Sequence, residues 1–91
     1  MSNKSVINAF LCGNSASSSN RNLRTYEGKL VSYYTVIAQR LSDGTILLNK
    51  TKYSVSTSKI QSWLYASVVG KKTKDVTNVP LGTYDLTRYV K

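Results

Sequence analysis

Apolar residues between positions 29 and 49 occur in short runs separated by turn residues, a pattern typical of β-strands. Residues 29–41 form the longest run, and their Val, Tyr and Thr content favours a strand over a helix. Apolar side chains occupy both alternating faces, so we expect one central strand, either covered on both sides or bent by a bulge. Ser42-Asp43-Gly44 then predicts a tight hairpin, because Asp-Gly tolerates positive φ angles. Residues 45–49 are expected to return antiparallel.

Weaker patterns extend the sheet on both sides. Residues 23–26 predict a short strand that turns at Glu27-Gly28. Residues 53–55 predict another short strand after a kink at residues 50–52. Residues 76–81 are expected to be extended, with Pro80 confining them to an edge or a loop.

A helix is predicted over residues 58–69, because apolar side chains recur there with near-helical spacing and Gly70 follows. Ser56, Thr57 or Ser58 can each cap it, and Gln61 lies three residues after Ser58, as in a capping box. The spaced residues are Ile60, Trp63, Leu64, Ala66, Val68 and Val69. We expect Trp63 to anchor this helix on the sheet; the alternative is an exposed stacking residue.

The two ends of the chain are more ambiguous. Ser5 can cap a short helix whose apolar face either docks on the sheet or orders on a partner, with Gly13 after its end. Residues 14–22 are small and polar, which predicts a mobile loop. Residues 83–90 fit either an alternating strand or a short helix capped by Thr83, and we favour the helix.

These patterns predict a single α+β domain over residues 1–91. Residues 1–22 would form the short N-terminal helix and the polar loop, and residues 23–91 the sheet-helix core. The expected architecture is an antiparallel sheet of three or four strands with one main helix packed on a face, plus the short N-terminal helix. A chain of 91 residues has room for one modest core and little room for an enclosed substrate pocket.

Charge is the strongest compositional feature. Thirteen Lys and Arg residues against four Asp and Glu residues give a formal charge of +9. Such an excess predicts attraction to nucleic acid, to an anionic membrane surface or to an acidic protein, although it also serves solubility. We expect no membrane association, because no run of residues approaches the length of a membrane span.

Enzyme chemistry is not supported by the residues present. The chain has no His, and Cys12 therefore lacks the usual partner that activates a nucleophilic thiol. The four carboxylates are scattered, and no glycine pattern of a phosphate loop occurs. We expect no catalytic residue, no cofactor and no metal ion. A single Cys and the lack of a signal-peptide pattern favour the cytosol.

Residues 49–59 (NKTKYSVSTSK) are the most suggestive segment for binding, with three lysines and five hydroxyl residues beside Tyr53. Its last part would lie at a helix N-terminus, where free N–H groups attract anions. Residues 71–74 add a second lysine cluster after the helix, where cations also favour the helix dipole. The alternative is structural, with hydroxyls that cap the helix and lysines that only solvate turns. The candidate binding residues are Lys50, Lys52, Tyr53, Ser56, Thr57, Ser58, Lys59, Lys71, Lys72 and Lys74.

Residues 35–49 and 51–64 together resemble a family of small uncharacterised proteins of bacterial phages and mobile elements. The family has a Tyr-rich strand ending in Ile-Ala, a hairpin, and a T-K-Y-S-x-[ST]-T-S-K segment that leads into a helix. Here residues 51–59 match that segment, Gln61 matches the Gln of a following His-Gln pair, and Ile60 stands in place of the His.

The resemblance implies a phage accessory protein that acts in the host cytosol without catalysis. It would bind and occlude a host defence protein or nucleoprotein through its basic surface, as an anti-CRISPR protein blocks a Cas effector. Direct, sequence-nonspecific nucleic-acid binding is one alternative. A structural or virion-associated role is another.

Overall fold

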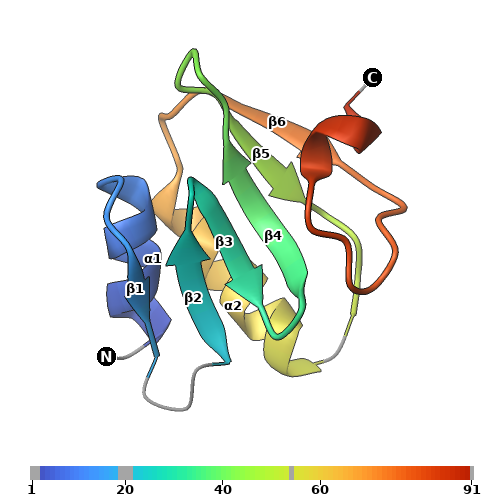
Figure 1. The fold of residues 1–91 in the computed structure, drawn as a ribbon, viewed down its shortest axis with the longest axis horizontal. Helices are drawn as coiled ribbons and strands as arrows, with labels where there is room; N and C mark the ends of the chain where they lie inside the picture. The colour runs from blue at the N-terminus through green and yellow to red at the C-terminus, as the bar shows by residue number, and fades with distance from the viewer. Residues whose placement is uncertain (1–2, 19–21, 54, 91) are drawn as a thin grey trace.

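The computed structural model describes residues 3–18, 22–53 and 55–90, and of residue 56 the backbone only. Its centre is a six-stranded sheet whose strands lie side by side in chain order (Figure 1). Neighbouring strands are antiparallel except the last pair, which is parallel. The strands are β1 (Ala16–Ser17), β2 (Leu23–Tyr26), β3 (Lys29–Ser32), β4 (Thr35–Arg40), β5 (Ile46–Asn49) and β6 (Thr73–Val76).

Helices cover both faces of this sheet. The helices α1 (Asn3–Leu11) and α2 (Val55–Ser67) pack on one face, where their apolar side chains join those of β2 to β5 in one core cluster. The short 3₁₀ helix η1 (Leu86–Tyr89) covers part of the other face with a smaller cluster (Figure 1). Neither α-helix has the length and apolar composition needed to cross a bilayer.

The predicted α+β class is confirmed, but the prediction of three or four antiparallel strands is wrong. One cause is that residues 29–41 are two strands, β3 and β4, joined by a turn at Tyr33-Tyr34. Tyr33 adopts a φ of 58°, a conformation usually taken by Gly or Asn, so its residue type did not indicate the turn. A second cause is β1, which forms in the expected polar loop by pairing with Thr25 and Arg24. Residues 19–21 of that loop lie outside the described part of the chain.

The third cause is β6, which runs parallel to β5 because α2 serves as the crossover between them. Extended structure was expected at residues 76–81, whereas the strand is Thr73–Val76.

The bulge and the two-sided burial expected for residues 29–41 are confirmed. Leu30 pairs with Ala38 and Val31 with Val36, which leaves Ile37 as an extra residue in β4.

The main helix begins earlier than predicted, at Val55. Of the expected strand at residues 53–55, Tyr53 is not in a strand and Val55 is helical, whereas Ser54 lies outside the described residues. Ile60, Leu64 and Val68 are its buried stripe. The prediction that Trp63 anchors the helix is wrong, since this side chain is 38 % exposed on the flank toward α1. Trp63 lies about 100° around the helix from Leu64, just outside the buried stripe.

The ends of the chain both pack on the sheet. Docking of the N-terminal helix is confirmed, with Val6, Ile7 and Phe10 buried, although it begins at Asn3 and not after Ser5. The C-terminal segment contains a short helix as predicted, but its cap is Asp85, whose carboxylate accepts a hydrogen bond from the Thr87 N–H. Thr83 lies before that cap, in a turn.

Candidate functional site

Asn49, at the end of β5, organises the predicted binding segment. Its fully buried side chain donates to the Val36 carbonyl at 3.0 Å and to the Tyr53 hydroxyl at 2.9 Å. Its Oδ1 accepts from the Thr51 N–H at 3.0 Å. Its backbone carbonyl accepts from Gln61 Nε2 at 2.7 Å and from the Tyr65 hydroxyl at 2.6 Å. These bonds fix the path of residues 49–53 and bind it to α2.

Several of the predicted binding residues are committed to this framework. The Tyr53 hydroxyl donates to the Val79 carbonyl at 2.6 Å. Thr57 is 5 % exposed, with its hydroxyl 3.4 Å from that of Ser32. Ser58 is half-buried, and the side chain of Ser56 lies outside the described residues. The hydroxyls of Tyr53 and Thr57 therefore make contacts within the protein and are not free for an anion.

The expected capping box does not form, because Ser58 lies inside α2 and Gln61 is used elsewhere. Gln61 Nε2 donates to the carbonyls of Asn49 and Thr51. The amide of Gln61 is thus a link between α2 and the residues after β5.

The lysines of the segment remain on the surface. Lys50 Nζ lies 3.6 Å from the centroid of the Tyr65 ring, within the range of a cation–π contact. Lys52 and Lys59 are exposed and have no carboxylate partner among the residues that the structure describes.

The second predicted lysine cluster lies at the other end of β6. The Ile46 N–H bonds to the Lys72 carbonyl, whereas the Lys50 N–H bonds to the Val76 carbonyl, one strand length away. Lys72 Nζ also lies 3.6 Å from Asp43 Oδ2 in an exposed ion pair. Lys71 and Lys74 are exposed near it. The structure therefore does not join Lys71, Lys72 and Lys74 with the lysines of residues 50–59.

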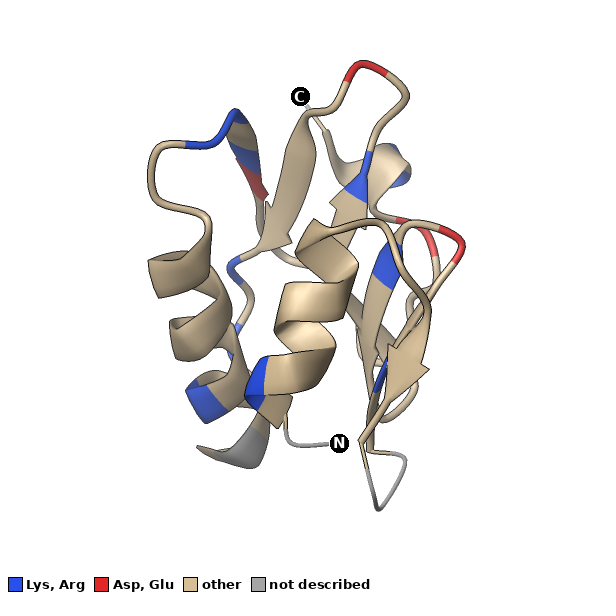
Figure 2. Ribbon diagram, turned by 90° about the vertical axis from the view of Figure 1, so that its left-hand side faces the viewer, with Lys and Arg blue, Asp and Glu red and all other residues tan. Residues whose placement is uncertain are grey.

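A basic surface forms instead around α2. Neither α1 nor α2 contains an Asp or Glu, and Figure 2 shows the two helices side by side with lysine blue on their lower turns. Lys4 Nζ lies 5.5 Å from the centroid of the Trp63 ring, on one flank of α2. Lys59 is exposed one turn before Trp63, and Lys50 with Tyr65 marks the other flank. We call Lys4, Lys50, Lys59, Trp63 and Tyr65 the basic helical face.

The acidic residues lie mostly elsewhere. Glu27 and Asp43 are in the β2–β3 and β4–β5 turns, at the end of the sheet opposite to the Tyr33-Tyr34 turn. Asp85 caps η1 on the other face of the sheet. Asp75 on β6 is close enough to act on Tyr65: burial foremost, and then the Asp75 charge, raises the pKa of Tyr65 to about 12.

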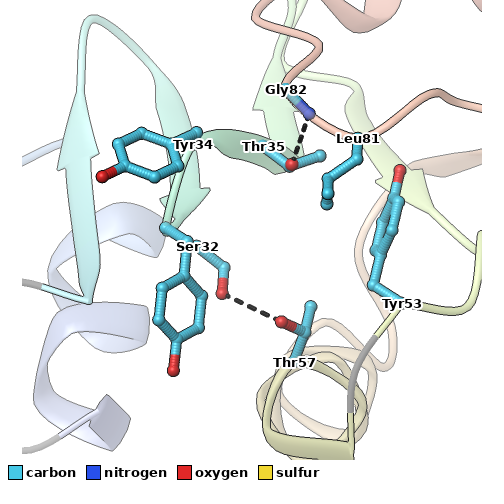
Figure 3. Close-up of a pocket in the computed structure, with 8 residues that line it drawn as sticks. Ser32, Tyr34, Thr35, Tyr53, Thr57, Leu81 and Gly82 are labelled. Carbon is cyan, nitrogen blue, oxygen red and sulfur yellow. Dashed lines mark hydrogen bonds between the residues drawn. The ribbon is translucent and has the colours of Figure 1, made fainter.

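An open groove of about 760 Å³ adjoins the start of α2 (Figure 3). We call it the tyrosine groove. Its walls come from the β3–β4 turn, from the segment before α2, from the first turn of α2 and from the loop before η1. Its lining residues are Ser32, Tyr33, Tyr34, Thr35, Tyr53, Thr57, Leu81 and Gly82.

Sequence reasoning found only Tyr53 and Thr57 of this groove. Tyr33 and Tyr34 were assigned to a continuous strand, and the pair of adjacent tyrosines was the only signal that the sequence offered for this part of the groove. Leu81 and Gly82 are about 50 residues away from them in the chain, and no local pattern connects the two segments.

Across the described residues, no three His, Cys, Asp or Glu side chains lie close enough to hold a metal ion. Cys12 is exposed after the end of α1.

Comparison with family models, with curated proteins and with solved structures finds no match. The resemblance to the phage and mobile-element family therefore stays an expectation from the sequence.

Proposed function

We propose that this chain is a non-catalytic binding protein that occludes a host protein or nucleoprotein through its basic helical face, together with Lys52. The observation that carries the proposal is that both helices lack acidic residues, while Lys4 contacts Trp63 on one flank of α2 and Lys50 contacts Tyr65 on the other. Such a surface attracts an acidic partner and offers aromatic contact area once the partner is bound. An anti-CRISPR-type inhibitor of a Cas effector in the host cytosol is the specific form that the family resemblance favours.

Lys52 and Lys59 are available for binding because other groups hold the fold in place. The path of residues 49–53 is held by Asn49, Gln61 and Tyr65, and not by Lys52 or Lys59. A charge change at an exposed lysine is expected to alter the free energy of unfolding by about 0.5 kcal/mol or less. Binding and folding are therefore separable by mutation.

The test is a Lys52→Glu/Lys59→Glu double variant, with Lys71→Glu/Lys74→Glu as the matched control at the other end of β6. Each tagged protein is used to capture partners from a bacterial lysate, with and without nuclease, and is added to target cleavage by purified Cas9. We expect capture that resists nuclease, inhibition of the effector, and loss of both in the first variant only. Equal capture by the two variants would contradict the basic helical face as the site.

The salt dependence of binding distinguishes direct nucleic-acid binding from occlusion of a protein partner. If naked DNA or RNA is the partner, affinity falls steeply with added salt, because each phosphate contact releases counterions. A complex that disappears after nuclease treatment, and that reforms with a purified oligonucleotide at low salt, would replace occlusion of a protein by this alternative.

A further inference from the structure

The tyrosine groove carries large aromatic and aliphatic side chains that remain exposed to solvent. Tyr34 is 80 % exposed and Leu81 77 %, and Tyr33 is 42 % exposed beside them. These side chains come from separate segments but line one groove (Figure 3). Contiguous exposed apolar surface in a small domain is typical of an interaction site.

The hydroxyls of Ser32, Thr35, Tyr53 and Thr57 are already paired within the protein. The Ser32 and Thr57 hydroxyls lie 3.4 Å apart, and the Thr35 hydroxyl accepts from the Gly82 N–H at 2.8 Å. The Tyr53 hydroxyl donates to the Val79 carbonyl. These bonds hold the walls in place before a ligand arrives, which lowers the entropy cost of binding. They leave ring faces and aliphatic carbon as the main contact surface.

The lack of charged residues in the lining makes a nucleic-acid strand a poorer occupant of the groove than an apolar side chain. All eight lining residues are uncharged, so a phosphate backbone laid in the groove would meet no lining cation. A bulky apolar side chain needs no cation and can bind to this uncharged lining. The nearest cation along the chain is Lys52, exposed directly before Tyr53, while Glu27 and Asp43 lie at the opposite end of the sheet.

We infer that the tyrosine groove binds an extended acidic peptide segment of a partner protein. One large apolar side chain of that segment enters between Tyr34, Tyr53 and Leu81, and its flanking Asp or Glu residues face Lys52. The groove volume lies within the range of sites that bury such groups. This inference rests on the proposed function for the existence of a protein partner, and it adds the chemistry of the segment that the partner presents.

The experiment is selection of a displayed library of random twelve-residue peptides on the immobilised full chain. We expect the enriched peptides to combine one Trp, Phe or Leu with neighbouring acidic residues. Binding of a labelled, enriched peptide is then measured by fluorescence anisotropy. We expect Tyr34→Ala and Leu81→Ser to weaken it about tenfold or more, as for central interface anchors.

Matched controls are available on exposed residues away from the groove. Tyr26 is 53 % exposed at the end of β2, and Val69 is 81 % exposed after α2. We expect Tyr26→Ala and Val69→Ser to leave peptide binding unchanged. Thermal melting of all four variants checks that each is folded; a variant that does not melt cooperatively is replaced by the milder Tyr34→Ser or Leu81→Ala.

Three results would overturn the inference. They are the absence of any enriched peptide, enrichment that is insensitive to both groove variants, and binding of a twelve-nucleotide single strand that the groove variants abolish. Each is distinct from failure of the proposed function, which is judged by capture of partners from lysate and by Lys59→Glu alone, because Lys52 also faces the groove.

Discussion

The Tyr65 hydroxyl donates a hydrogen bond of 2.6 Å to the backbone carbonyl of Asn49 and so ties the third turn of α2 to the end of β5. Gln61 reaches the same oxygen from one turn earlier on the helix. Two side chains of α2 therefore satisfy both lone pairs of one buried carbonyl. These two bonds fix the backbone at Asn49, directly before the segment that carries Lys50 and Lys52.

Replacing Asn49 tests this anchoring. Asn49→Ala removes the hydrogen bonds to the Val36 carbonyl, the Tyr53 hydroxyl and the Thr51 N–H, and leaves those groups short of partners. We expect the free energy of unfolding to fall by about 2–4 kcal/mol, as measured by urea denaturation. Lys52→Ala is the control, with an expected change of about 0.5 kcal/mol or less. Equal effects of the two variants would show that the network does not stabilise the fold.

Alkaline pH tests the environment of Tyr65. Burial foremost raises its pKa from 10.0 to about 12, so the folded state holds the proton more tightly than the unfolded state. The resulting stability is fully present below the unfolded pKa and is lost as pH rises through the folded value.

We therefore expect wild type to be more stable than Tyr65→Phe by about 1 kcal/mol at neutral pH, because the variant lacks one hydrogen bond. That advantage should shrink between pH 10 and about 12. Urea denaturation of both proteins along a pH series is the measurement, with tyrosinate absorbance reporting ionisation. A constant difference across that range would argue against the raised pKa.

Trp63 is the only Trp of the chain, so its fluorescence reports one site. Its partial exposure and the neighbouring Lys4 predict efficient quenching by iodide, because the lysine attracts the anion. Lys4→Glu is expected to reduce iodide quenching while leaving quenching by neutral acrylamide nearly unchanged. Emission that iodide does not quench would place Trp63 in the core, as the sequence alone predicted.

Arg40 is expected to contribute to stability despite its charge. Its Nη2 donates to the carbonyls of Phe10 at 2.8 Å and Leu11 at 2.7 Å, at the C-terminal end of α1. Such charge-assisted bonds to helix carbonyls favour a cation. We expect Arg40→Ala to lower the free energy of unfolding by about 2 kcal/mol and to speed amide exchange in α1. Arg24→Ala, at an exposed position of β2, should change neither quantity appreciably.

The candidate site shows why local patterns gave a partial prediction. Hydroxyl-rich sequence before an amphipathic run is consistent both with a capped helix and with an anion site, and only the partners of Thr57 and Tyr53 distinguish them. The lysines of residues 50–59 and 71–74 were both assigned to binding, and only the parallel pairing of β5 and β6 shows that a strand length separates them. The tyrosine groove is lined by both Tyr34 and Leu81, and their separation in the chain hides it from any local pattern.

The sequence by itself determined the elements whose causes are local. The Asp43-Gly44 hairpin, the turn at Glu27-Gly28, the docked N-terminal helix and the Ile60/Leu64 stripe follow from turn chemistry and periodicity. Only the tertiary structure decided the turn at Tyr33, the edge strand β1 and the parallel β6. In these cases pairing with a neighbouring strand outweighs the weak preferences of the residues themselves, because backbone groups at a sheet must find partners.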